Sequence, residues 1–284
     1  MQTCYKHSGK APPIGVLLGL TGGVLAVIPL SFAYAYGIIH IPEVKLRAIC
    51  TIAFGVLVGV ATGLGMVWGK VRNNFVAVGA GLLTSLAALY VSWGIWILDI
   101  ISPGKWGLDS TKLLTSPQLI WQIILAINPR GTWGLQHEAP MRGIPLWIIW
   151  ASEASLILLC GILVAVALVR RTPFCENCDQ WCSGPEKLYY APSVDSADLK
   201  AKIENQQFSD IQKLVQGDPK AAKAQIHLHT CSTCGRLNTL TLIRSTAGSR
   251  KILFNKLLIS DSDAGFLGRQ KPVTAMQASV GGSL

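Results

Sequence analysis

Charged residues are scarce in this chain. Only 14% of its 284 residues are charged, whereas 50% are hydrophobic. An ordinary soluble domain has roughly 25% charged residues, so the composition excludes a wholly soluble protein. Acidic residues are especially rare in the first part, where five of the fifteen precede Arg170: Glu43, Asp99, Asp109, Glu138 and Glu153. The sequence therefore consists of an apolar part and a more polar part that meet near residue 170.

Signals for several functional classes are missing. We find no nucleophile–base pair, no phosphate-binding loop and no catalytic zinc motif, so we expect a protein that is not an enzyme. The net charge of +10 includes no basic cluster interleaved with aromatic residues, which argues against nucleic acid as a partner. A cytoplasmic membrane surface, which attracts Lys and Arg, accounts better for this charge. No clear cleavage site follows the first apolar run, which is also too long for a signal peptide.

Four apolar segments are long enough to cross a bilayer. Their approximate bounds are residues 14–39, 48–68, 75–101 and 144–169. Each is near or above the ~20 residues that a transmembrane helix needs. Because only a helix satisfies its own backbone hydrogen bonds in lipid, we expect an α-helical membrane bundle of four transmembrane helices. The lipid bilayer is the first partner that the sequence predicts.

Glycine recurs every four residues in the first two segments, at Gly15/Gly19/Gly23, Gly55/Gly59/Gly63 and Gly65/Gly69. This spacing forms a groove on one helix face and lets two backbones approach closely. We therefore expect these faces to pack helices together. The sequence leaves open whether they do so within one chain or in a homodimer through the glycine-rich helices.

Two carboxylates lie within the apolar segments. Glu153 is about one-third of the way into the fourth segment, and Asp99 is near the end of the third. An acid at this depth is costly and is a candidate functional residue. The simplest interpretation is a neutral Glu153 that hydrogen-bonds within the bundle, with Ser152 and Ser155 as candidate partners. The alternative is a small transporter or channel-like protein that uses Glu153 as its intramembrane polar centre.

The connection from about residue 102 to 143 is more than a plain loop. It contains an apolar run, Leu119–Ile127, between Pro117 and Pro129. Nine residues are too few to span the bilayer, but they suit an interfacial or re-entrant helix. We therefore expect an interfacial segment here, within a transmembrane domain that covers residues 14–169.

Cysteines gather immediately after the fourth segment. Cys175 and Cys178 form one CxxC pair, and Cys231 and Cys234 form a second in "HTCSTCG". Each pair places two thiolates on one tight turn, and two such turns complete a tetrahedral zinc site. Gly235 follows the second pair, where glycine tolerates a positive φ. The pattern resembles a zinc ribbon, which implies a small domain around a structural zinc ion.

Other ligands and other chemistries stay open for this site. Cys182, His227 and His229 are candidate extra metal ligands, although the two histidines can equally be exposed polar residues of a strand. Iron is an alternative to zinc, because four cysteines also bind iron in rubredoxin-like electron-transfer sites. A thiol–disulfide redox pair and structural disulfides are the remaining alternatives.

The polar part of the chain reads as a small α+β domain of residues 170–260. Period-two alternation predicts strands in "AQIHLHT", "RLNTLTLI" and "KILFNKLLIS", and "EKLYYA" reads as a further strand. Residues 196–216 read as a helix that breaks near Gln207, with Ser196 as its N-cap. Residues 261–284, rich in small and polar residues, are expected to form a mobile tail.

The cysteine chemistry also predicts the compartment. Zinc thiolates need reduced cysteine, so we expect the metal domain in the cytosol, together with both termini and an N-terminal tail of residues 1–13. A plasma or inner membrane is the expected location. Because all four preferred ligands are cysteines, the site has no open position for a reacting water. The sequence thus predicts an integral membrane protein with a cytosolic zinc-ribbon-like domain that binds or scaffolds a partner protein.

Overall fold

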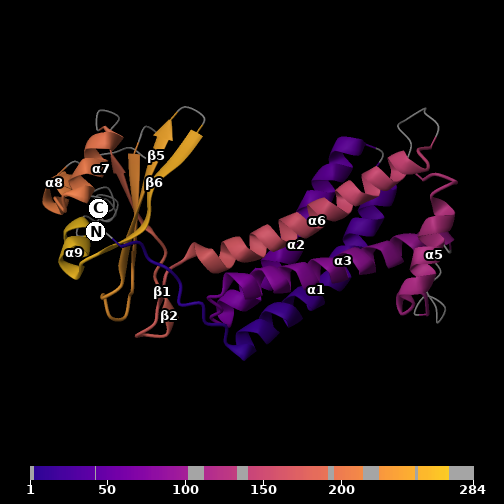
Figure 1. Ribbon diagram of the computed structural model, residues 1–284, viewed down its shortest axis with the longest axis horizontal. Coiled ribbons are helices and arrows are strands. Elements are labelled where there is room, and N and C mark those ends of the chain that lie inside the picture. Colours follow the sequence, from indigo (N-terminus) through magenta and orange to yellow (C-terminus); the bar gives the residue numbers. More distant parts are fainter. Residues whose placement is uncertain are drawn as a thin grey trace, which may run out of the picture. The chain divides into compact units, whose positions relative to one another are not determined.

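The computed structural model describes residues 3–41, 43–101, 112–132, 140–190, 195–213, 224–246 and 249–268. The chain divides into two compact units (Figure 1). The helical unit comprises residues 8–171, and the sheet domain combines residues 1–7 with residues 172–284. The helical unit is thus one continuous stretch, whereas the sheet domain is assembled from two separate stretches of the chain.

Four long helices build the helical unit: α1 (Pro13–His40), α2 (Val44–Trp68), α3 (Asn74–Ile101) and α6 (Ile144–Arg171). All four are long and apolar enough to cross a membrane, which confirms the predicted bundle. Helices α1 and α6 each pack against both α2 and α3. Helix α2 begins four residues before the expected start, because its first turn accommodates an exposed Lys45 and a half-buried Arg47, whose Nε donates to the carbonyl oxygen of Ile41.

The glycine faces of α2 pack against the neighbouring helices of the same chain. A methyl group on Gly59 would lie 2.6 Å from the carbonyl oxygen of Gly161 in α6. A methyl group on Gly65 would lie still closer to the carbonyl oxygen of Leu18 in α1. Only residues without a side chain permit such contacts between backbones. A homodimer through these glycines would therefore have to compete with contacts that already exist within the chain.

Hydroxyl groups add polar contacts to the interior of the bundle. Thr62 Oγ1 and Thr84 Oγ1 lie 2.9 Å apart, between α2 and α3. Ser31 Oγ donates across helices to the carbonyl oxygen of Ala88, at 3.3 Å. Both threonine hydroxyls also bond to carbonyl oxygens of their own helices. The interior is thus held by small polar groups as well as by close backbone contacts.

The short helix α5 (Pro117–Ile127) matches the apolar run predicted between the two prolines. Its buried face consists of Ile120 and Ile124, which pack with Leu146 and Trp150 of α6. The helix has 11 residues, too few to cross a bilayer. Its place at the membrane interface stays a prediction, and residues 102–111 and 133–139 of the same segment lie outside the described residues.

The sheet domain has a four-stranded antiparallel sheet in the order β3 (Glu186–Tyr190), β4 (Ala224–Thr230), β5 (Asn238–Thr246) and β6 (Ser249–Ile259). Helices α7 (Ser196–Glu204), α8 (Phe208–Lys213) and α9 (Asp261–Gly268) share one apolar core with it. Alternation places every second residue of β4, beginning with Ala224, Ile226 and Leu228, in that core. The predicted small β-sheet domain is confirmed in this form.

The N-terminal tail belongs to the sheet domain. The backbone N–H of Tyr5 donates to the carbonyl oxygen of Lys256 at 2.8 Å, and the N–H of Leu258 donates to Thr3 at 3.0 Å. The Tyr5 hydroxyl donates to the carbonyl oxygen of Phe174 at 3.1 Å and accepts from its N–H at 2.9 Å. Residues 3–5 therefore extend the sheet beyond β6, although the sequence suggested only a separate tail.

Two local expectations need correction. Residues 261–268 do not belong to a mobile tail, because they form α9, and its Ala264 and Leu267 are buried in the core. Residues 269–284 lie outside the described residues. The first helix of the domain is capped by Asp195, whose side chain accepts from Ala197 N, rather than by Ser196. The break predicted near Gln207 in this helix is the connection between α7 and α8.

Candidate metal centre and membrane cavity

The two CxxC pairs form two similar turns. In the first, strand β1 (Phe174–Cys175) pairs with β2 (Gln180–Trp181), so that the chain reverses around Cys178. In the second, Gly235 N donates to the carbonyl oxygen of Cys231 at 2.9 Å. The residue after each pair has a positive φ, of 49° at Asp179 and 67° at Gly235. The sequence indicated this backbone shape only for the glycine, yet aspartate also tolerates it.

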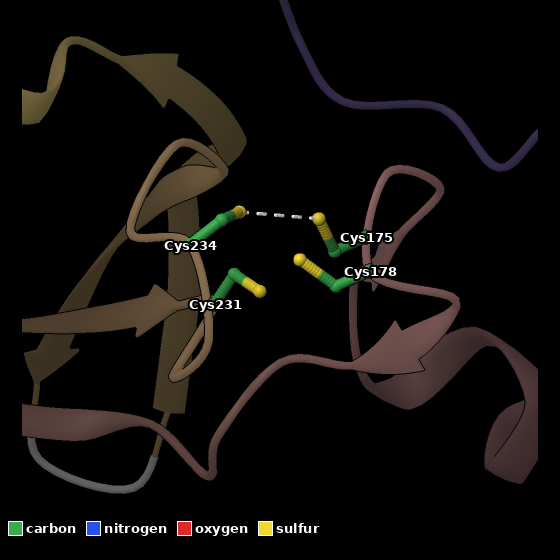
Figure 2. A group of neighbouring side chains, drawn as sticks. All are labelled: Cys175, Cys178, Cys231 and Cys234. Carbon is green, nitrogen blue, oxygen red and sulfur yellow. Dashed lines mark hydrogen bonds between the residues drawn. The ribbon is translucent and has the colours of Figure 1, made fainter.

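The four cysteine sulfurs converge from the two turns. Figure 2 shows Cys175 and Cys178 on one side and Cys231 and Cys234 on the other, with their side chains directed toward one another. All four sulfur atoms lie within 4.8 Å of each other, and those of Cys175 and Cys234 are 3.6 Å apart. Zinc–sulfur bonds of about 2.3 Å in a tetrahedron place sulfurs ~3.8 Å apart. The group therefore has the size and the donor atoms of a Cys4 metal site.

Burial and hydrogen bonding shift the pKa values of the cysteine thiols in different directions. Hydrogen bonding with the Cys234 side chain, followed by burial, raises the pKa of Cys178 to about 12. Burial also raises the pKa of Cys175. At Cys231 burial acts in the same direction, but hydrogen bonds from the backbone of Cys234 and Thr233 prevail and lower the pKa to about 6. Without a cation, the protein thus supports one thiolate and keeps at least two of its neighbours protonated.

A polar side chain from the first turn reaches the second turn. Gln180 Nε2 lies 3.7 Å from the sulfur of Cys231 and also donates to the Thr233 hydroxyl. Partners of this kind orient the ligands of a metal and contribute to its affinity. The sequence did not single out Gln180, because a glutamine in a short turn has no distinguishing pattern.

The three extra candidate ligands lie outside the group of four. Cys182 is buried in the same small cluster, and burial, followed by the neighbouring thiols, raises its pKa to about 12. His229 is not an exposed strand residue as expected, since it is 7% exposed and its Nδ1 lies 3.0 Å from the carbonyl oxygen of Ser183. His227 is half-buried, with its Nε2 3.4 Å from Gln225 Oε1.

Glu153 lines a cavity of about 300 Å³ inside the helical unit. Arg47 of α2 lines the same cavity and attracts the carboxylate electrostatically. The predicted serine partners are not used, because Ser152 and Ser155 donate to carbonyl oxygens of their own helix at 2.7 Å. Asp99 is not among the described residues that line this cavity. The sequence placed Arg47 only beside a span, whereas the fold brings it to the cavity that Glu153 lines.

Comparisons with known proteins give the chain no relative, since no protein-family model, curated protein or solved structure shows a significant match. Functional inference therefore depends on the geometry of the two sites. The four-cysteine group can hold a metal ion with all four protein ligands in place. The cavity around Glu153 offers one carboxyl and one guanidinium group within an apolar bundle.

Proposed function

We propose that the chain is an integral membrane protein whose sheet domain contains a structural zinc ion and serves as a docking platform for a partner protein. The observation that carries this proposal is the convergence of four cysteine sulfurs from two turns. Four thiolates fill a tetrahedral zinc ion, which leaves no position for substrate or water. The ion supplies structural cross-linking, and the proposed protein is accordingly not an enzyme.

The position of the group in the domain supports a structural role. The first turn directly follows helix α6, and the second joins β4 to β5 in the middle of the sheet. Between them lies a chain of more than fifty residues, so one ion would close a long loop. Closing such a loop restricts the unfolded chain, which stabilises the folded domain.

A cytosolic location for the domain is part of the proposal. All eight cysteines are free thiols, as a reducing compartment requires. Arg170 and Arg171, at the end of α6, agree with a cytosolic exit of that helix. A plasma or inner membrane satisfies both conditions.

Metal content of the full-length protein, purified in detergent and analysed elementally, is the first test. We expect about one zinc per chain. The variant Cys231→Ser should lose the metal, whereas Cys182→Ser, which changes a buried neighbour outside the group, should retain it. One iron per chain and a red-brown colour would instead support rubredoxin-like electron transfer. A folded protein without metal would reject the proposed centre.

Thiol labelling tests the orientation. Cys4 is exposed, and we expect a membrane-impermeant thiol reagent to modify it only after the cells are permeabilised. Glu43 is exposed between α1 and α2, at the other end of α1. The variant Glu43→Cys should therefore be labelled in intact cells. The reverse pattern would place the metal domain outside the cytosol.

The cavity around Glu153 favours a second candidate function, a small transporter or channel-like protein. A carboxylate and a guanidinium in a membrane-embedded cavity are typical of ion or proton pathways. Proton and cation fluxes into proteoliposomes provide the measurement. This candidate requires a flux with the unaltered protein that Glu153→Gln abolishes, and fluxes equal to those of empty vesicles would reject it.

A further inference from the structure

A second, apolar space lies next to the cavity around Glu153. This groove has a volume of about 530 Å³ and lies between α3, α5 and α6. Its walls are almost entirely apolar and include Leu86, Ile120, Ile124, Ala151 and Ala154. Its size is within the usual range of ligand sites, ~300–1,000 Å³. A flexible hydrocarbon chain fits such a surface, because the walls offer few hydrogen-bonding groups.

A row of tryptophans connects the two spaces. Trp96 lines only the polar cavity, whereas Trp121 and Trp147 line only the groove, and Trp93 and Trp150 line both. Adjacent rings in this row are in contact, with centroid distances of 5.1 Å between Trp93 and Trp150 and 5.2 Å between Trp147 and Trp150. The cavity, with its polar groups, and the apolar groove thus lie side by side and share part of their lining.

The polar end carries an acidic side chain, a basic side chain and a hydroxyl group. A Glu153 carboxylate can accept hydrogen bonds from an ammonium group, and the nearby indole rings favour the same cation. Arg47 provides a guanidinium, whose planar N–H groups match phosphate oxygens. Thr132 lines this cavity with a buried hydroxyl that has no hydrogen-bond partner among the described residues. An ammonium group beside Glu153 favours its ionised form, which balances the charge of Arg47, so the cavity suits a ligand that is itself zwitterionic.

We propose that the helical unit binds one membrane phospholipid with a zwitterionic headgroup. The ammonium group lies against Glu153 and the tryptophans, and the phosphate lies against Arg47 and Thr132. One acyl chain occupies the groove between α3, α5 and α6. A soluble zwitterion would fill only the cavity and leave the apolar groove unused. An anionic phospholipid would match Arg47 but place its negative charge beside Glu153. This lipid site is independent of the four-cysteine centre.

Quenching of tryptophan fluorescence by brominated lipid provides the test. The full-length protein is placed in nanodiscs of phosphatidylglycerol that contain small, increasing fractions of phosphatidylethanolamine with brominated acyl chains. Brominated phosphatidylglycerol with the same chains serves as the reference lipid. Because the tryptophan row lines the groove, a bound brominated chain lies beside it and quenches its emission.

We expect half-maximal quenching at a fraction of brominated phosphatidylethanolamine roughly tenfold lower than that of brominated phosphatidylglycerol. Glu153→Gln should remove most of this preference, and Thr132→Val should weaken it by a smaller factor. Asp99→Asn is the matched control, because it neutralises another carboxylate of the bundle that does not line the cavity. That variant should retain the full preference.

Three outcomes would overturn the proposal. Equal quenching by the two brominated lipids in the unaltered protein would show that the site does not distinguish headgroups. A preference that survives in Glu153→Gln would show that the carboxylate does not bind the ammonium. A loss of the preference in Asp99→Asn as well would show that the effect does not come from the cavity. If Glu153→Gln does not fold, the Thr132→Val result decides, and an unchanged preference there contradicts the proposed headgroup site.

Discussion

Helix α1 of the helical unit and the core of the sheet domain bury different kinds of side chain. In the helical unit the buried positions of α1 include Gly15, Gly19 and Ser31, whereas Leu25 is 73% exposed. In the sheet domain the corresponding interior contains large apolar residues such as Ile226, which is fully buried. The solvent explains the difference. Moving an apolar side chain from lipid into a helix interface gains little hydrophobic free energy, so membrane helices rely on close approach of small residues. The sheet domain instead gains hydrophobic free energy by moving large apolar side chains from water into its core.

This contrast implies that the two units respond to different disturbances. The sheet domain has a compact apolar core and a four-cysteine group that can bind a metal. The helical unit has no group of three or more metal-ligating side chains among its described residues. Removing the metal, enlarging a small residue or truncating a large one should therefore each affect one unit more than the other.

Metal removal should produce the largest effect, and only in the sheet domain. A structural zinc ion contributes ~10–16 kcal/mol of apparent binding free energy at neutral pH. A domain of this size has roughly 5–15 kcal/mol of stability in total. We therefore expect a strong chelator to unfold the sheet domain, detected as rapid proteolysis after α6. The helical unit should keep its helical circular dichroism, and loss of both signals together would contradict the independence of the two units.

Truncation of a large apolar residue should have the second-largest effect, and the effect should differ between the two units. Ile226→Ala removes a side chain from the core of the sheet, and we expect a loss of about 3 kcal/mol in the free energy of unfolding. Leu25→Ala in α1 removes an exposed side chain and should change the stability of the helical unit by less than about 0.5 kcal/mol. Denaturant titration of the detergent-solubilised protein, monitored separately for each unit, measures both. Similar losses would show that Leu25 is not at a lipid-facing surface.

Acidity should weaken metal binding in the sheet domain. The pKa of Cys178 is raised to about 12 and that of Cys175 is raised above its ordinary value, so both thiols are protonated at neutral pH without metal. Metal binding displaces at least these two protons, so affinity should fall by at least about a hundredfold for each unit of decreasing pH near neutrality. Below the Cys231 pKa of about 6, a further proton should steepen the loss. Zinc-competition titrations at several pH values give the slope, and a slope near zero would contradict the assignment.

Enlarging a buried glycine should destabilise the helical unit and not the sheet domain, and the effect should be smaller. Gly59→Ala places a methyl group 2.6 Å from the Gly161 carbonyl oxygen, and we expect a loss of about 2 kcal/mol from the helical unit. Gly79→Ala in α3 is the matched control, because its methyl group would meet nothing within 4 Å. The control should be neutral or slightly stabilising, since alanine favours helix. Thermal unfolding in nanodiscs compares the two variants, and equal behaviour would show that the α2–α6 contact is loose.

Much of the fold could be predicted because its signals are local. Long apolar runs define α1, α2, α3 and α6 within a few residues, and period-two alternation defines β4, β5 and β6. The CxxC spacing likewise identified the four sulfurs that the structure brings together. Each of these patterns depends on neighbouring residues, which is why one sequence suffices to detect it.

What could not be predicted depends on distant partners or on weak local signals. The pairing of residues 3–5 with β6 uses backbone groups alone, so no side-chain pattern marks it. The shared cavity of Arg47 and Glu153 depends on how α2 packs against α6. Helix α9 did have a detectable signal, because the Ser260 hydroxyl accepts from the backbone N–H of Asp263 as an N-cap and donates to the Asp263 carboxylate. Its two glycines, Gly265 and Gly268, obscured that signal.

The pairing of the N-terminal residues with β6 has a consequence for membrane topology. Residues 3–5 precede α1 and β6 follows α6, yet both belong to one folded sheet domain. A folded domain lies on one side of a membrane, so the chain between these segments must cross the bilayer an even number of times. The four candidate spans satisfy this parity, and α5 cannot be a fifth crossing by itself. Backbone hydrogen bonds at the edge of a sheet thus determine that the number of membrane crossings is even, without any reference to hydropathy.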